Sequence, residues 1–304
     1  MKPANIRKFD SLATTACLGV ILFWTLGPIC IKLLTAHIDS WTQNLLRYSA
    51  ACLFWLPYLF YVSRKKQFEP KIWRKALYPA GANIIMQSLW AAAFYYIDPA
   101  LMILLAKSAI VWIAFFSIIF FAQERPLVKS KRFWIGMLLS IIGIIGAMCL
   151  EEGFGTKKTV LGITITLGAA FMWAVYAISA KIAFRNIDSR IGFSVMSIYT
   201  VAGLAVLAMI FGDIGQCLQM GVLPWAYVFF SGISAIALGH VLYYTAIKRI
   251  GATIPSLALL VTPFTTLAIS RVVFGETLTP LQWLFGIVLL IGGGLAIWSQ
   301  QHLK

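Results

Sequence analysis

Lys107 is the residue of this chain most able to do chemistry, because it carries a charge deep inside an apolar segment. It lies eight residues after Pro99, about 12 Å along a helix that rises 1.5 Å per residue. A lysine at membrane depth costs at least about 2.5 kcal/mol and is a functional candidate by default. At this depth its ammonium does not easily reach the headgroups. We expect it to face a cavity and bind a carboxylate, sulfonate or phosphate; the alternative is a lysine bonded to backbone carbonyls between helices.

The other basic residues within apolar segments lie close to segment ends, where a long side chain can extend to the headgroups. They are Lys32, Arg47, Lys181 and Arg271. All ten acidic residues fall at segment ends or in loops. Pumps driven by protons or Na⁺, and carriers of organic cations, generally use a carboxylate at membrane depth, so the sequence argues against both. Glu124 and Glu276 occupy equivalent segment ends, and we expect them to fix helix ends or close a gate.

Two polar residues, Gln87 and His240, occupy equivalent positions in the two halves of the chain, 153 residues apart. Asn83, Gln87 and Trp90 share one helical face, and so do His240 and Tyr244. Amide and imidazole groups cannot face lipid cheaply, so these faces should point into protein or a wet cavity. His240 is either a packing residue or a cavity residue. In the second case it is the one candidate proton sensor at membrane depth.

Trp24 lies in the middle of the first apolar segment, not at an interfacial belt, so we expect it to line the site as well. The full set expected to bind substrate is Lys107, Gln87, Trp90, His240, Tyr244, Trp24 and Asn83. We expect no catalytic residue, cofactor or metal, because the three histidines lie in separate elements without an HExxH motif. The five cysteines are scattered and show no metal-ligand spacing.

The elements that must position these residues are membrane-spanning helices. The chain is 61% hydrophobic and 12% charged, with a mean hydropathy of +0.86, far outside the range of soluble domains. Apolar windows of roughly 20 residues, the length that crosses a bilayer, occur at about 12–34, 41–62, 76–96, 99–121, 133–150, 160–181, 191–211, 223–247, 253–274 and 281–299. We therefore expect an all-α integral membrane protein of ten transmembrane helices.

The chain also repeats itself. Leu18, Gly19, Trp24 and Lys32 recur 149 positions later as Leu167, Gly168, Trp173 and Lys181. Glu124, Gly136 and Gly143 return as Glu276, Gly286 and Gly293. We expect two five-helix repeats, at 1–152 and 153–304. Because five is odd, the second repeat must be inverted relative to the first, which is a usual architecture of solute transporters.

The distribution of charge predicts the orientation. With both termini on one side, eighteen basic residues lie on that side and two, Lys157 and Lys158, lie on the other. The positive-inside rule then places both termini in the cytoplasm. The net charge of +15 is loop charge facing anionic lipid rather than a sign of nucleic-acid binding. The first segment is expected to be an uncleaved span, and the cell membrane, a bacterial inner membrane, is the expected location.

Several motifs carry a resemblance to a known family. They are Trp24 with Lys32, Arg47-Tyr48, the 99–146 stretch around Glu124, Trp173 with Lys181, the run 244–252, and Thr262-Pro263 leading to Gly275-Glu276. On these residues, and over nearly its whole length, the chain resembles the EamA-like branch of the drug/metabolite transporter superfamily. It departs from the family pattern at Val111, where the second half has Pro263. The halves also differ at two equivalent positions of the repeat: Lys107 corresponds to Leu259, and Arg47 corresponds to Met196. A site between the halves therefore need not be symmetric.

A transporter is therefore the expected function, with a small carboxylate- or anion-bearing metabolite as substrate and alternating access as mechanism. The resemblance implies export of amino acids or related metabolites. The alternatives are a carrier of phosphorylated or nucleotide-linked solutes, an importer, or a drug exporter. An enzyme would need paired carboxylates, a His cluster or a nucleophile with its base at depth, and a channel would need pore charges or filter-like repeats. Glycine stripes on two segments suggest close packing within a monomer or between the protomers of a homodimer.

Overall fold

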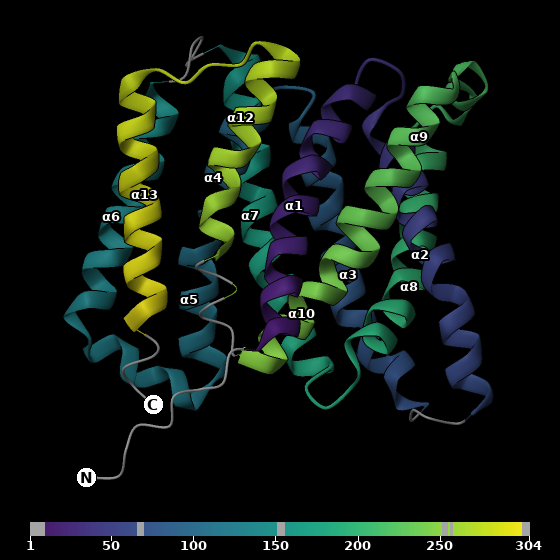
Figure 1. Ribbon diagram of the computed structural model, residues 1–304, viewed down its shortest axis with the longest axis horizontal. Coiled ribbons are helices and arrows are strands. Elements are labelled where there is room, and N and C mark those ends of the chain that lie inside the picture. Colours follow the sequence, from purple (N-terminus) through teal and green to yellow (C-terminus); the bar gives the residue numbers. More distant parts are fainter. Residues whose placement is uncertain (1–9, 66–69, 151–155, 251–254, 256–257, 300–304) are drawn as a thin grey trace.

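The computed structural model describes residues 10–65, 70–150, 156–250, 255 and 258–299 (Figure 1). Every regular element within these ranges is a helix. Those of the first half are α1 (Ser11–Leu34), α2 (Ser40–Arg64), α3 (Lys71–Ala93), α4 (Pro99–Ala106), α5 (Ala109–Phe120), the 3₁₀ helix η1 (Ala122–Lys129) and α6 (Lys131–Cys149). Those of the second half are α7 (Lys157–Ala183), α8 (Ser189–Phe211), the 3₁₀ helix η2 (Ile214–Gln219), α9 (Val222–Ser231), the π-helix η3 (Gly232–Leu238), α10 (Gly239–Ile250), the 3₁₀ helix η4 (Leu259–Val261), α12 (Thr262–Phe274) and α13 (Pro280–Ser299).

By length and composition, seven helical segments in the described ranges could cross a membrane, and a shorter apolar one covers Leu259–Phe274. The seven are Ser11–Leu34, Ser40–Arg64, Pro99–Phe120, Thr159–Ala183, Ser189–Phe211, Val222–Ile250 and Pro280–Ser299. The windows predicted at 76–96 and 133–150 also coincide with helices, α3 and α6. The all-α membrane class expected from composition is thus confirmed.

Two of the predicted spans are not continuous α-helices. The window at 99–121 is interrupted at Lys107 and Ser108, which separate α4 from α5. The window at 223–247 contains the π-helix η3 between α9 and α10. Non-helical backbone at membrane depth is tolerated where it faces protein or a wet cavity, and both irregular segments do line a cavity.

The equivalent helices α1 and α7 run in opposite directions. Going along α7, Gly162 lies against Ile97 and Gly168 lies against Leu89, so α7 is antiparallel to α3. Helix α1 runs parallel to α3, because the amine of Lys32, near its end, bonds to the Phe94 carbonyl just after α3. The first helices of the two repeats therefore have opposite senses, as Figure 1 also shows.

Glycines allow α6 and α13, the last helices of the two repeats, to pack with their backbones in contact. A Cβ atom at Gly143 would lie 2.5 Å from the backbone nitrogen of Leu289, and one at Gly292 would lie 2.6 Å from the Gly136 carbonyl oxygen. The expected stripe on α6 thus packs against α13 within one chain, whereas Gly286 and Gly293 of the second stripe lie against Leu104 of α4 and Ile110 of α5.

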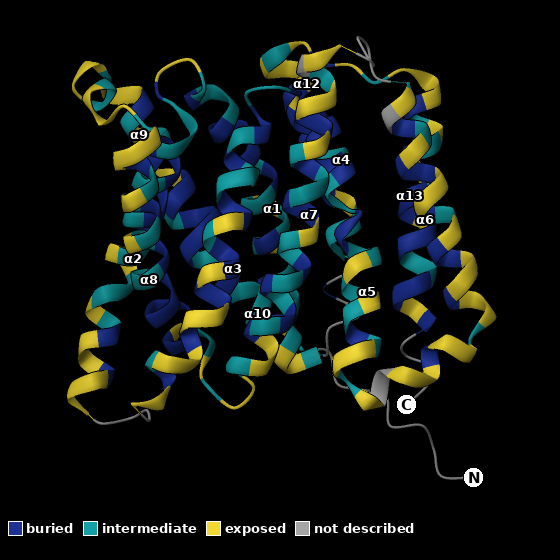
Figure 2. Ribbon diagram, turned by 180° about the vertical axis from the view of Figure 1, so that it is seen from behind, coloured by how far each residue is buried: buried dark blue, intermediate teal, exposed yellow. Residues whose placement is uncertain are grey.

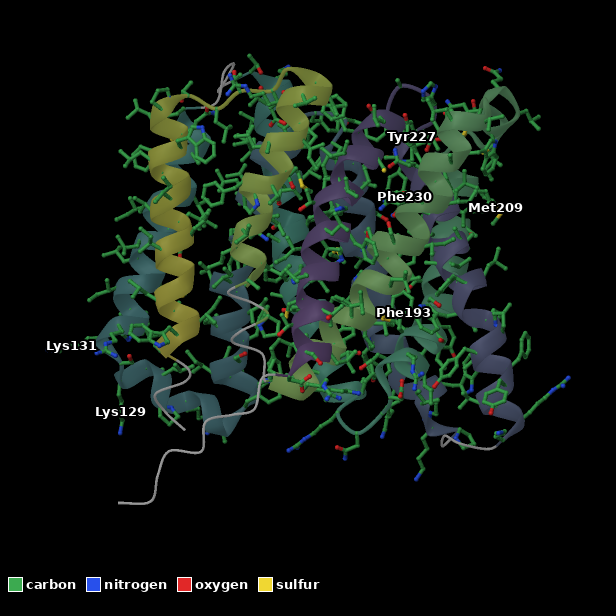
Figure 3. All side chains as sticks on the ribbon, in the orientation of Figure 1. Lys129, Lys131, Phe193, Met209, Tyr227 and Phe230 are labelled. Carbon is green, nitrogen blue, oxygen red and sulfur yellow. The ribbon has the colours of Figure 1, made fainter. Side chains whose placement is uncertain are left out.

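The two ends of the bundle differ in charge. Helix α1 begins and α13 ends at the same end, the lower one in Figure 1, and we call it the basic end. Lys129 and Lys131 project there, whereas the exposed Met209 and Phe230 lie in the upper half of the bundle (Figure 3). Exposed large apolar residues are spread over the outer faces of the helices, and buried residues lie between them (Figure 2). This is the surface expected of a bundle surrounded by lipid.

Candidate functional site

A cavity of about 170 Å³ lies between helices of both repeats. Its walls are mainly apolar, and its polar and aromatic side chains are Trp24, Arg47, Gln87, Trp90, Lys107, Trp173, His240, Tyr243 and Thr262. None of the described residues that line it is an aspartate or a glutamate. Because its two charged side chains are both basic, its electrostatic potential favours an anionic ligand over a cation.

Five of the seven residues expected to bind substrate line this cavity: Trp24, Gln87, Trp90, Lys107 and His240. They come from α1, α3, the break between α4 and α5, and α10. The structure thus brings together side chains that are separated by up to 216 positions in the sequence. Their role in binding stays a prediction.

Lys107 lies at the break between α4 and α5. The backbone there follows tight bonds between residues three apart: the N–H of Lys107 donates to Leu104 and that of Ile110 to Lys107, at 3.1 and 3.0 Å. Among the described residues, no acidic side chain, carbonyl or hydroxyl pairs with the ammonium of Lys107. The expected alternative, a lysine bonded to backbone carbonyls, is therefore not what this arrangement shows. The ammonium thus lines the cavity without a partner among the described residues.

The corresponding part of the second repeat is irregular as well. The 3₁₀ helix η4 contains Leu259, the sequence equivalent of Lys107, and leads into α12 at Thr262 and Pro263. Leu259, Leu260 and Thr262 line the same cavity. Interrupted helices from two repeats that meet at a central site are a feature of many secondary transporters.

His240 is buried in an aromatic cage beside the π-helix. Its ring centroid lies 5.6 Å from that of Trp24, 5.9 Å from that of Trp173 and 5.5 Å from that of Phe193. Its Nδ1 lies 2.9 Å from the Ile236 carbonyl oxygen, and its Nε2 has no partner among the described atoms. Its expected role as a proton sensor stays a prediction.

The same π-helix receives a second side-chain bond. The indole Nε1 of Trp24 donates to the carbonyl of Ala235 at 2.9 Å. Side chains from α1 and α10 thus satisfy carbonyls in a stretch where the regular α-helical pattern is broken. Trp24 also contacts Trp173, its equivalent in the second repeat, edge to face at 5.6 Å. Two equivalent residues in contact mark the interface of the repeats, so the cavity lies at that interface.

Two of the predicted residues lie away from the cavity. Asn83 is fully buried and donates from Nδ2 to the hydroxyls of Tyr48 and Thr200, at 3.0 and 3.2 Å. It lies one turn before Gln87 on α3, where α3 packs against α2 and α8. Its amide therefore bonds α3 to these two helices and does not reach the cavity. Tyr244 lines a second hollow, and its hydroxyl donates to that of Tyr176 at 2.8 Å.

Arg47 is the residue that the sequence analysis misplaced. It was expected to extend to the headgroups, but it lines the cavity and only 2% of it is exposed. The reason is local packing: at Gly232 the missing Cβ brings the π-helix against the Arg47 backbone, and Ser231 Oγ accepts a 2.9 Å bond from Arg47 Nε. Its Nη1 has no partner among the described atoms.

The end of the bundle opposite the basic end is closed by polar contacts. Glu276, which is 7% exposed, accepts bonds from the N–H groups of Ala100 and Leu101 at 2.9 and 3.3 Å, and from the Ser270 hydroxyl. Burial raises the pKa of this carboxyl, although these bonds favour its ionised form. A carboxylate of the second repeat thus caps helix α4 of the first, in agreement with the expected role in fixing helix ends.

Other contacts at this end join neighbouring segments. Lys32 Nζ lies 3.1 Å from Asp98 Oδ1 and donates to the Phe94 carbonyl at 3.1 Å. Gln43 Nε2 donates to the Tyr95 hydroxyl at 3.0 Å. These contacts hold the ends of α1, α2 and α3 together above the cavity.

Toward the basic end the bundle is hollow. A second space of about 330 Å³ adjoins the first and shares Ile110, Ile113, Trp173, Tyr243 and Ile297 with it. The basic residues that line this second space are Lys181, Arg185 and Lys248. The two spaces are thus adjacent, with the second nearer the basic end, and the polar contacts of Glu276 and Lys32 lie at the opposite end.

The sequence model of the EamA-like transporter family matches the chain twice, over residues 11–149 and 160–298. The chain belongs to the EamA-like transporter family. The family expected from the sequence motifs is therefore confirmed. Each match falls within one of the two predicted repeats, so this EamA-like chain is built from two copies of the family's unit.

Relatives of this EamA-like chain are described as uncharacterized transporters. One from Haemophilus influenzae is 25% identical over 188 residues, 59% of each chain. One from Clostridium kluyveri is 24% identical over 170 residues, 54% of this chain and 53% of the relative. The matches thus span between half and three fifths of the length of these relatives. A solved crystal structure with 15% identity shares the fold, with a TM-score of 0.67 over 95% of this chain and 98% of the other.

This membership establishes the broad class. The EamA-like chain is a multi-pass membrane protein of a transporter family. The names of its relatives indicate neither a substrate nor a direction.

Proposed function

We propose that this EamA-like transporter exports a small carboxylate-bearing metabolite, an amino acid or a related acid, by alternating access. The observation that carries the proposal is the ammonium of Lys107, which lines a cavity without any acidic neighbour among the described residues. A charge held in an apolar cavity is stabilised by an ion of opposite sign, and the carboxylate of the substrate supplies it. The indole and imidazole rings of Trp24, Trp90 and His240 would then contact the rest of the molecule.

The proposed topology has ten spans in two inverted repeats, with both termini in the cytoplasm of a bacterial cell. The excess of lysine and arginine at the basic end supports this orientation. The cavity then leads to the cytoplasm and is closed toward the outside, as in an inward-facing state. A cytoplasmic substrate would enter it past Lys181, Arg185 and Lys248, whose charge attracts anions.

Release on the other side requires the external contacts to separate. Glu276 would leave the first turn of α4, and Lys32 would leave Asp98. The repeats would rock about their interface, where Trp24 meets Trp173, and the spaces that are now open near the basic end would close. Alternating access in inverted-repeat transporters takes this general form.

The test is untargeted metabolite profiling of the medium around cells that overproduce the wild-type protein, Lys107→Leu, Arg271→Leu or the empty vector. We expect one class of organic acid to accumulate with the wild type and with Arg271→Leu, whose arginine is exposed on α12 outside the cavity. Lys107→Leu should resemble the vector at equal membrane abundance. Accumulation of the same solutes with Lys107→Leu would exclude this lysine from the site, and solutes without an acidic group would reject the substrate class.

A further inference from the structure

Arg47 is a second buried cation on the wall of the cavity. None of the described residues that line the cavity is acidic, and the one side chain that bonds to the guanidinium among the described residues is the neutral Ser231. A desolvated arginine without a counter-charge is strongly destabilising. Lys107 on the same wall also lacks a counter-charge. Two negative charges on a bound molecule, rather than one, would therefore be needed to neutralise the cavity.

The guanidinium is fixed in a way that leaves its fork available. The hydroxyl of Ser231 donates to the Tyr227 carbonyl at 2.6 Å, so its oxygen accepts the bond from Arg47 Nε. This holds the planar group at one edge, while Nη1 is buried and has no partner among the described atoms. Arginine binds carboxylates and phosphates through its N–H groups, and an anion at this guanidinium would satisfy the buried Nη1.

Further unsatisfied groups lie one turn before Arg47 on α2. Gln43 Oε1 and both side-chain polar atoms of Asn44 are buried without partners among the described atoms. Positions three and four residues before an arginine share its helical face, so these groups lie on the same side of α2 as Arg47, outside the lining of the cavity. Buried polar groups without partners are rare in folded proteins and mark places where a ligand or water binds.

The two cations belong to the first repeat only. Met196 stands at the position equivalent to Arg47, and Leu259 at the position equivalent to Lys107. The second repeat contributes Trp173, His240, Tyr243, Thr262 and apolar residues instead. A ligand bound between the repeats would therefore meet both cations on the side of the first repeat and the rings of Trp173, His240 and Tyr243 on the side of the second.

We propose that the substrate carries two anionic groups, one bound by Lys107 and the other by Arg47. This inference rests on the proposed function and narrows its substrate class to dicarboxylates, including acidic amino acids, and phosphate esters that carry a carboxylate. The shared chemistry is a pair of negative charges on one small molecule. Arg47 is then the residue that distinguishes such a molecule from a monoacid of the same size.

The experiment measures binding of matched probes to the purified full chain by ligand-dependent thermal stabilisation at constant ionic strength. The pairs are butyrate with succinate, glutamine with glutamate, and glycerate with 3-phosphoglycerate. Within each pair only one member carries the second anionic group. We expect at least one doubly anionic member to bind about tenfold or more tightly than its partner, because a hydrogen bond to a charged group is worth that factor.

Variants assign the preference to a residue. In Arg47→Gln, the ratio of the affinity for the doubly anionic probe to that for its singly anionic partner should fall close to one, while the singly anionic probe still binds. Lys107→Leu should abolish binding of both probes of a pair. Arg47→Lys should keep part of the ratio, because it retains the charge without the fork. The control Arg271→Gln, outside the cavity, should keep the full ratio. Should Arg47→Gln fold poorly, Ser231→Ala provides the second variant, with a smaller fall in the ratio.

The outcomes separate this inference from the proposed function. A wild-type ratio near one, with binding that still depends on Lys107, would overturn the second anionic group and leave the carboxylate carrier intact. An unchanged ratio in Arg47→Gln would show that another residue binds the second group. If none of the six probes binds in a Lys107-dependent way, the proposed substrate class itself is rejected.

Discussion

Lys107 should destabilise the fold and yet be required for transport, and the two effects can be measured separately. Its ammonium has no acidic neighbour among the described residues, and the cavity wall around it is made of residues such as Ile103, Ala106 and Ile110. Leucine fits that wall without the desolvation penalty of a charge. We expect Lys107→Leu to lose transport while raising the free energy of unfolding by about 1 kcal/mol or more. Thermal unfolding beside the transport assay tests this, and a loss of both properties would indicate a structural lysine.

At the scale of single residues, depth within an apolar segment predicted Lys107 well and Arg47 poorly. Lys107 is eight residues from the start of its window and Arg47 is six residues from the start of its own, so the criterion separated two residues with nearly equal depth. The decisive difference is not local. Arg47 is turned inward by Ser231, 184 positions away, and no pattern around Arg47 itself contains that partner.

At the scale of the element, one carboxylate caps a helix of the other repeat. Glu276 accepts bonds from the first N–H groups of α4, which have no partners within the helix. Glu276→Gln replaces one acceptor oxygen by a donor. We therefore expect the free energy of unfolding to fall by about 1–3 kcal/mol, the usual cost of a buried unpaired group. The control is Asp98→Asn, because the pair of Asp98 with Lys32 is partly exposed and should contribute under about 1 kcal/mol. Equal thermal shifts in the two variants would contradict a capping role for Glu276.

Asp39 caps α2 and should make the external contacts sensitive to acid. Burial by itself raises the pKa of this carboxyl, but bonds from Thr42, Trp41 and the Asp213 N–H outweigh it and lower the pKa. A lowered pKa means that the stabilisation is present above the unfolded value of about 4 and is lost as the pH falls through the folded value. An asparagine at this position would still cap the helix, so we expect Asp39→Asn to cost only about 0.5 kcal/mol near pH 7.

The measurement is the thermal midpoint of wild type and Asp39→Asn between about pH 7 and pH 3. The gap between the two proteins should shrink as the pH falls, because protonation removes from the wild type the charge that the variant lacks. A gap that widens in acid would contradict a lowered pKa of Asp39 in the folded protein.

Hydropathy located the helical elements but not the irregularities within them. The windows at 12–34 and 281–299 agree with α1 and α13 to within one residue, because segment length and apolar content follow directly from the thickness of the bilayer. The break at Lys107 contains neither proline nor glycine, and carbonyls of the π-helix η3 are contacted by the side chains of Trp24 and His240. The contact from Trp24 to the π-helix joins residues 211 positions apart, so no local pattern in the sequence contains it.

At the scale of the whole molecule, the two ends of the bundle are built differently. The cavity beside Lys107 continues toward the basic end, whereas Glu276 and Lys32 hold the opposite end together. In an inverted pair, the same units can exchange these two arrangements. The resting protein should therefore expose its cavity to one side of the membrane only, and this asymmetry is open to direct measurement.

Ala106 is the position for that measurement, because it lines the cavity beside Lys107 and tolerates the small change to cysteine. In a chain whose native cysteines are replaced, we expect Ala106→Cys to react with a membrane-impermeant maleimide in inside-out vesicles and to be protected in intact cells. Lys129→Cys at the basic end and Leu218→Cys at the other report the orientation of each preparation. Adding Glu276→Gln should increase labelling from outside, because the external contacts then separate more often. Labelling of Ala106→Cys from outside alone would reverse the proposed inward-facing state.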